Sequence, residues 1–194
     1  MKKNNQIFVI IFGAIIAFSL ILSAQTRRDR QTQPEKLMDV AGVTPGMVIG
    51  EAGAGEGYFT FHLSKRVGKK GRIYANDIDQ EALQEIIHRC EREGVENIET
   101  VLGKIEDPLF PVRKLDMVTM LYAFHDFTEK EAWLKNVKKY MKDDANLVIF
   151  DPQDIHTGMT EELVAELGKK AGFKLVKCYE VHNGIWVYIL KINI

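Results

Sequence analysis

Hydrophobic and polar positions follow two different periods along most of the chain, and these periods predict its secondary structure. Short apolar runs are typical of buried strands, whereas longer stretches with apolar residues every three or four positions are typical of amphipathic helices. The pattern predicts helices over 34–41, 58–67, 80–93, 129–141 and 160–171. It predicts strands over 47–49, 72–76, 98–102, 115–121, 147–150, 174–179 and 185–191.

The order of these elements predicts the fold class. Strands alternate with helices through most of the chain, which favours a mostly parallel sheet covered by helices on both faces. Only residues 180–184 separate the last two strands, so we expect those strands to form an antiparallel hairpin. The prediction is an α/β, doubly wound, Rossmann-like domain with a seven-stranded sheet.

The amino terminus departs from this rhythm, because residues 7–24 form an apolar run without a charged residue. A helix of that length spans roughly 27 Å, close to the thickness of a bilayer core. We expect residues 1–24 to be a membrane anchor or, alternatively, a secretory signal, although cleavage after Ala24 would place Leu22 at a position that favours small residues. Basic residues flank both sides of the run, so the sequence does not indicate which side of the membrane the domain faces.

The remaining chain has room for one domain, which we place at residues 34–194 after a polar linker over 25–33. The charges of the full chain are balanced, with 26 lysines and arginines against 27 aspartates and glutamates. This balance argues against a nucleic acid partner, which would require an excess of basic residues. The oligomeric state is not predicted.

A glycine-rich stretch joins the first predicted strand to the helix that begins at Tyr58. Gly53, Gly55 and Gly57 alternate there with other residues. Glycine lets the backbone turn sharply and approach a ligand closely at the carboxyl end of a strand. A dinucleotide fold would place its third glycine at position 58, where this chain has the bulky Tyr58. A nicotinamide-dependent oxidoreductase therefore remains only an alternative.

An acidic residue follows the second predicted strand. Asp77 lies twenty residues after Gly57, at the tip of that strand. A carboxylate in this position can accept hydrogen bonds from both hydroxyls of a ribose, which predicts an adenosine-binding residue. Asp79 directly precedes a predicted helix and is expected to cap it.

These residues resemble class I S-adenosylmethionine-dependent methyltransferases, and the resemblance covers about residues 34–191. It implies S-adenosylmethionine as the cofactor, with Glu51 near the methionine moiety, the glycine loop beneath the cofactor and Asp77 on the ribose. The cofactor-binding residues expected on this basis are Glu51, Ala52, Gly53, Gly55, Gly57, Asp77, Ile78, Ile105 and Leu121.

The chain departs from this family after the third strand. The family often has an acidic residue there that contacts the adenine amino group, whereas this chain has Lys104, which cannot accept that hydrogen bond. Ile105 is expected to pack on the adenine ring, and Glu106 or Asp107 could supply the missing acceptor. The affinity for the cofactor depends on whether another residue accepts the hydrogen bond that Lys104 cannot accept.

Residues 116–126 resemble the fourth strand of the family and its active-site loop. His125 in this loop is expected to line the pocket near the methyl group and is the best candidate for a general base, with Asp126 orienting or charging it. The alternative is that His125 only shapes the loop. Asp151 and His156 are weaker candidates for the same cleft. No metal site is predicted.

We therefore expect an S-adenosylmethionine-dependent methyltransferase. Little material is inserted between the core elements, which favours a small-molecule acceptor over a macromolecule. The apolar amino terminus makes a lipid-soluble acceptor plausible. The alternative from a different class is a non-catalytic binding or scaffold module with this fold at the membrane.

Overall fold

The computed structural model of the protein describes residues 26–154 and 159–193. The chain divides into two units, residues 1–33 and Pro34–Ile194. Of the first unit, residues 26–32 are helical. The expected anchor at residues 7–24 and the candidate His156 lie outside the described residues. Within the described ranges, no helix is both long and apolar enough to cross a membrane.

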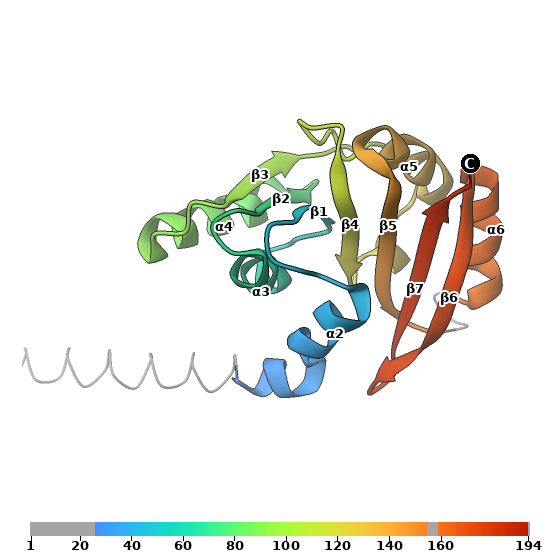
Figure 1. Cartoon of the computed structure of the whole chain (residues 1–194), viewed down its shortest axis with the longest axis horizontal. Coiled ribbons are helices and arrows are strands. Elements are labelled where there is room, and N and C mark those ends of the chain that lie inside the picture. The colour runs from blue at the N-terminus through green and yellow to red at the C-terminus, as the bar shows by residue number, and fades with distance from the viewer. Residues whose placement is uncertain (1–25, 155–158, 194) are drawn as a thin grey trace, which may run out of the picture. The chain divides into compact units, whose positions relative to one another are not determined.

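The second unit is built on a seven-stranded sheet in the order β3-β2-β1-β4-β5-β7-β6 (Figure 1). The first five strands in this order pair in parallel, while β7 pairs antiparallel with both β5 and β6. The predicted mostly parallel sheet with a terminal hairpin is confirmed. The strands are β1 (Val48–Ala52), β2 (Arg72–Asp77), β3 (Ile98–Leu102), β4 (Leu115–Leu121), β5 (Met141–Pro152), β6 (Phe173–His182) and β7 (Ile185–Ile192).

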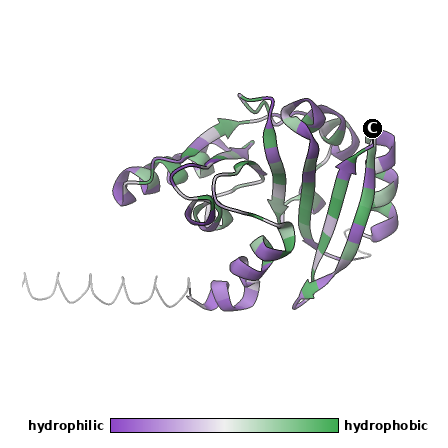
Figure 2. Cartoon of the chain, viewed as in Figure 1, coloured by the Kyte–Doolittle hydropathy of each residue, from purple (hydrophilic) through white to green (hydrophobic). Residues whose placement is uncertain are grey.

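Helices cover both faces of this sheet, as the alternation along β2 illustrates. Ile73 and Ala75 join apolar clusters with the helices of one face, whereas Tyr74 belongs to the cluster of the other face. Figure 2 shows hydrophobic stretches along β4 and β5 and a largely hydrophilic α4. The first face carries α2 (Pro34–Ala41), α3 (Tyr58–Val67) and α4 (Gln80–Glu93), and the second carries α5 (Lys130–Val137) and α6 (Glu161–Ala171).

The largest difference from the predicted elements lies between α5 and β5. The helix predicted to reach residue 141 ends at Val137 and is followed by a 3-10 turn, and β5 already begins at Met141. Met141 pairs with Leu115 of β4, and Lys142 forms an ion pair with Asp116. The polar residues at the start of β5 are therefore extended because they pair with β4. Hydrophobic periodicity could not predict this pairing.

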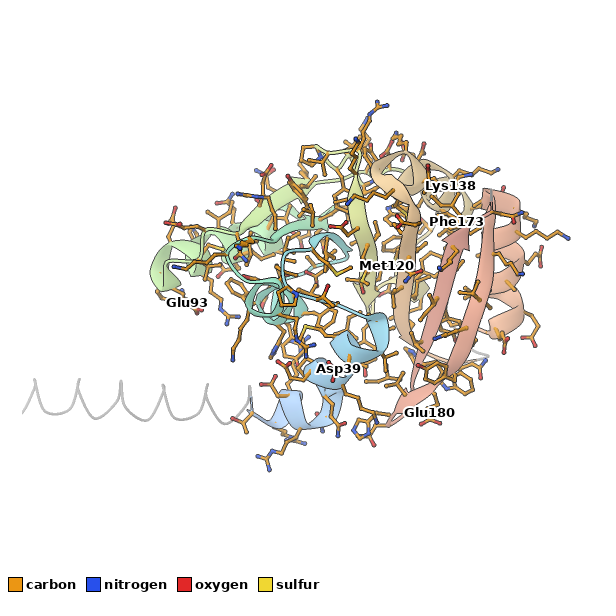
Figure 3. The ribbon with its side chains drawn as sticks, in the orientation of Figure 1. Asp39, Glu93, Met120, Lys138, Phe173 and Glu180 are labelled. Atoms are coloured by element: carbon orange, nitrogen blue, oxygen red, sulfur yellow. The ribbon has the colours of Figure 1, made fainter. Side chains whose placement is uncertain are left out.

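The first residue of the 3-10 turn, Lys138, lies beside the start of β6. Met120 on β4 is fully buried in the central cluster, and the Lys138 ammonium lies 6.0 Å from the ring centre of Phe173 (Figure 3). Phe173 and the helix α6 before it close the second face of the sheet. This face therefore reaches as far as the terminal hairpin.

The N-terminus of α4 provides a test of the local structure beside the glycine loop. The Asp79 side chain accepts hydrogen bonds from the backbone N–H groups of Glu81 and Ala82. Asp79→Ala is expected to lower the free energy of unfolding by about 1 kcal/mol, because the cap is lost. Urea denaturation measures this change. Glu85→Ala on the exposed side of α4 is the matched control, and equal losses for the two variants would contradict the capping role.

Candidate functional site

A cavity of about 370 Å³ opens at the carboxyl ends of the parallel strands. It lies where the sheet order reverses, because the chain passes outward from β1 to β2 and β3 on one side and from β4 to β5 on the other. Open α/β sheets bind ligands at such a switch point. The lining residues are Gly53, Gly55, Asn76, Asp77, Ile78, Lys104, Ile105, Tyr122, Ala123, Asp126, Phe127, Thr128 and Trp133.

The glycine loop contributes Gly53 and Gly55 to the lining of this cavity. Gly53 has a φ of +71°, and a Cβ at this position would lie 2.3 Å from the Cβ of Ala123 in the loop after β4. Gly55 also has a positive φ, of +52°. Gly53 thus lets the loops after β1 and β4 meet, which is the close approach expected of this motif, whereas a Cβ at Gly55 would meet no atom within 4 Å.

Asp77 lies at the end of β2 with its carboxylate facing the same loop. Its Oδ2 accepts a hydrogen bond of 2.8 Å from the Gly55 N–H, and its Oδ1 accepts one of 3.0 Å from the Asp79 N–H. A carboxylate offers about four lone-pair sites, so each oxygen keeps acceptor capacity toward the cavity. The structure therefore fixes the orientation of Asp77 and leaves it able to bind hydroxyl groups.

Glu51 lies directly behind the glycine loop rather than on the cavity wall. The residue is only 2% exposed, and its Oε2 has no hydrogen-bond partner among the described residues. Burial raises the pKa of Glu51 to about 8. The Thr60 side chain opposes this rise, although its geometry falls short of a hydrogen bond, and the charge of Asp77 adds to it. Burial thus favours the protonated form of Glu51.

The turn after β3 brings Lys104 and Ile105 to the cavity. The Asn76 side-chain amide donates to the carbonyl oxygens of Val101 and Pro108, at 3.0 and 2.9 Å, and so holds this turn to β2. Ile105 is exposed, and so is Ile78, which belongs to the same cavity lining. Two exposed isoleucines in one lining offer apolar contact to a flat ring.

Asp107 has structural partners instead of a place at the cavity. Its carboxylate accepts hydrogen bonds from Lys139 at 2.5 Å and Tyr140 at 2.8 Å, and from the Leu109 N–H at 3.0 Å. These three donors occupy the carboxylate of Asp107, which is not a lining residue of the cavity. Glu106 is not a lining residue either.

The loop after β4 places His125 against the end of β5. Its Nδ1 lies 2.7 Å from Oδ1 of Asp151, and its backbone N–H donates to Oδ2 of Asp151 at 2.9 Å. Asp126 Oδ2 lies 3.3 Å from the Nε2 of the same ring. Asp126 is one of the lining residues of the cavity, and His125 is not. The shorter contact is to Asp151, the residue ranked lower from sequence.

Asp151 is fully buried beneath this loop. Burial raises the pKa of its carboxyl, the two hydrogen bonds from His125 and the charge of that ring oppose the rise, and the nearby Asp126 adds to it. The histidine therefore compensates a carboxylate that water does not reach. Two hydrogen bonds therefore join His125 to the buried carboxylate of Asp151.

The structure brings six of the predicted site residues to the cavity: Gly53, Gly55, Asp77, Ile78, Ile105 and Asp126. The other predicted residues, Glu51, Ala52, Gly57, Leu121 and His125, are not lining residues. Sequence reasoning missed Asn76, Thr128 and Trp133. Trp133 is only 2% exposed and lies on the buried face of α5, so its pattern is indistinguishable from that of a core residue.

Comparisons with known proteins agree with this geometry. Residues 44–192 match the profile of a methyltransferase domain. The ubiquinone/menaquinone biosynthesis C-methyltransferase UbiE of Hydrogenovibrio crunogenus is 26% identical over 115 residues, and that of a Shewanella species is 27% identical over the same length. The alignment covers 59% of this chain and 45% and 46% of those relatives. The matched part thus spans about half the length of these curated relatives.

Solved structures share the fold. A SAM-dependent methyltransferase from Aquifex aeolicus superposes with a TM-score of 0.77 at 24% identity, covering 88% of this chain and 97% of that one. A SAM-dependent O-methyltransferase from Thermotoga maritima gives a TM-score of 0.63 at 15% identity, covering 83% and 65%. Because the methyltransferase profile spans most of the chain and the sheet has the same Rossmann-like architecture, the chain belongs to the class I S-adenosylmethionine-dependent methyltransferase family.

Proposed function

We propose that this chain transfers a methyl group from S-adenosylmethionine to a small, largely apolar acceptor. The observation that carries the proposal is the position of Asp77, which faces the glycine loop in a cavity of about 370 Å³ at the switch point of the sheet. This volume is within the range of small-molecule sites. The family match favours this function over a scaffold module or a nicotinamide-dependent enzyme.

The cofactor would occupy the half of the cavity beside β1 and β2. Asp77 would accept hydrogen bonds from the ribose, and Ile78 and Ile105 would contact the adenine ring. The uncompensated Glu51 Oε2 fits a ligand with positive charge, and S-adenosylmethionine carries an ammonium and a sulfonium group. When bound, this cofactor supplies an electrophilic methyl group, so the protein has mainly to align the acceptor and exclude water.

The acceptor would occupy the half beside the loop after β4. Tyr122, Phe127 and Trp133 line this part, and the rings of Phe127 and Trp133 pack edge to face with centres 5.3 Å apart. Such a wall favours an apolar or ring-bearing molecule. The UbiE relatives are named for C-methylation in ubiquinone and menaquinone biosynthesis, and the apolar run at residues 7–24 would suit a lipid-soluble acceptor.

The ribose contact gives the direct test of the proposed cofactor site. Asp77→Ala is expected to weaken S-adenosylhomocysteine binding at least tenfold, about 1.4 kcal/mol, because a charge-assisted contact is lost. Isothermal titration calorimetry of the full chain measures the affinity. Glu56→Gln, which changes an exposed carboxylate of the same loop outside the cavity lining, is the control and should bind normally. Unchanged affinity in a folded Asp77→Ala variant would refute the assignment.

The raised pKa of Glu51 predicts that cofactor binding releases a proton. With a pKa of about 8, Glu51 is protonated at pH 7, and a cation bound nearby would lower that pKa and favour ionisation. The release should vanish well above pH 8, where the free protein is already ionised. Titrating S-adenosylmethionine in two buffers with different ionisation enthalpies measures this proton. The buffer dependence should disappear in Glu51→Gln, and its persistence there would rule out Glu51 as the source.

A further inference from the structure

Two carboxylates flank the His125 ring, and they differ sharply in environment. Asp151, on the Nδ1 side, is fully buried, whereas the Asp126 side chain, on the Nε2 side, is 81% exposed and lines the cavity. The three side chains therefore run from the interior beside β5 to the cavity wall. A buried carboxylate, an imidazole and a group at the reacting centre form the arrangement by which proteins orient a base.

The Asp151 contacts determine which ring nitrogen carries the proton. Oδ2 of Asp151 accepts the His125 backbone N–H, so its Oδ1, 2.7 Å from Nδ1, is the remaining acceptor. A hydrogen bond at one ring nitrogen fixes the tautomer, so a proton on Nδ1 leaves Nε2 as the basic nitrogen. Nε2 is the atom that lies 3.3 Å from Asp126.

The loop that carries this ring is fixed from its other side as well. The Lys130 ammonium donates to the carbonyl oxygens of His125 and Phe127, at 2.8 and 2.5 Å. Its charge also interacts with Asp126 and Asp151, so Lys130 is the cation that faces both carboxylates. The backbone on both sides of Asp126 is thus held in place.

We propose that Asp151, His125 and Asp126 form a proton relay that opens on the cavity at Asp126, and that the acceptor is a molecule that loses a proton as it is methylated. Asp151 is a positioning residue in this relay. The inference rests on the proposed methyl transfer. A hydroxyl-bearing ring matches both the relay and the aromatic wall of Tyr122, Phe127 and Trp133.

The step balances without a further reactant. The acceptor atom forms a bond to the methyl carbon, the carbon–sulfur bond breaks, and its electron pair stays on sulfur, which becomes a neutral thioether. The proton of the acceptor passes to the Asp126 carboxylate and from there to Nε2 of His125, which later releases it to water. The charge lost at sulfur thus appears on the imidazole between two carboxylates.

The first test reads the tautomer directly, without any acceptor. In the full chain labelled with ¹⁵N-histidine, ring nitrogen shifts should show His125 protonated on Nδ1 and bare on Nε2, with His125→Gln identifying the signals. In Asp151→Asn, the amide oxygen must accept the backbone N–H, so the amide group would donate to Nδ1 and the proton should move to Nε2. Asp126→Asn, the matched carboxylate change on the exposed side, should leave the proton on Nδ1.

A ring protonated on Nε2 in the wild-type chain would overturn the relay, and so would a tautomer that follows Asp126 instead of Asp151. If Asp151→Asn fails to fold, the wild-type chain and Asp126→Asn still decide the question. S-adenosylhomocysteine titration of each variant separates the two proposals. Absent binding by the wild-type chain contradicts the methyltransferase function, whereas normal binding with the wrong tautomer contradicts only the relay.

The second test concerns the acceptor class and uses 4-nitrophenol as a chromogenic ring-bearing hydroxyl. Below the pH at which the free phenol ionises, the full chain saturated with S-adenosylhomocysteine should increase the phenolate absorbance. His125→Gln should not, because the relay then lacks its proton acceptor. No increase with the wild-type chain would overturn the proposed acceptor class.

Discussion

The close approach of two loops, those after β1 and β4, is the constraint on which the site depends. Gly53 allows it, since a Cβ there would lie 2.3 Å from the Cβ of Ala123. Because the loops meet at the switch point of the sheet, both contribute lining residues to the same cavity. Asp77 reinforces the arrangement by accepting the N–H of Gly55 from the same loop.

The burial of charge explains most of the remaining site. Glu51 on β1 and Asp151 on β5 are carboxyl groups removed from water, and burial raises the pKa of both. They are compensated differently, because Asp151 receives two hydrogen bonds from His125 whereas Glu51 Oε2 has no partner in the described ranges. The hydrogen bonds from His125 thus satisfy Asp151 within the protein, whereas the unpartnered oxygen of Glu51 suits a cationic ligand under the proposed function.

Much of the fold could be predicted from sequence because hydrophobic periodicity reports burial directly. The sheet, the terminal hairpin, the glycine loop and Asp77 follow from local patterns and from the resemblance to the family. What could not be predicted depends on contacts between distant segments. The pairing of His125 with Asp151 joins residues 26 positions apart, and the early start of β5 depends on its pairing with Leu115. The place of Trp133 in the cavity lining could not be predicted, because an apolar residue in a cavity wall has the same sequence pattern as one in the core.

The measurement that tests this account most directly is calorimetric titration of the full chain with S-adenosylmethionine, S-adenosylhomocysteine and NAD. The account predicts micromolar binding of the first two ligands and none of NAD. Tyr58 holds the position of the third glycine of a dinucleotide fold, and Glu51 Oε2, which has no partner among the described residues, suits a ligand with a cationic side chain. Failure of a folded chain to bind either sulfur ligand would contradict it. Binding of NAD alone would assign the cavity to a different chemistry.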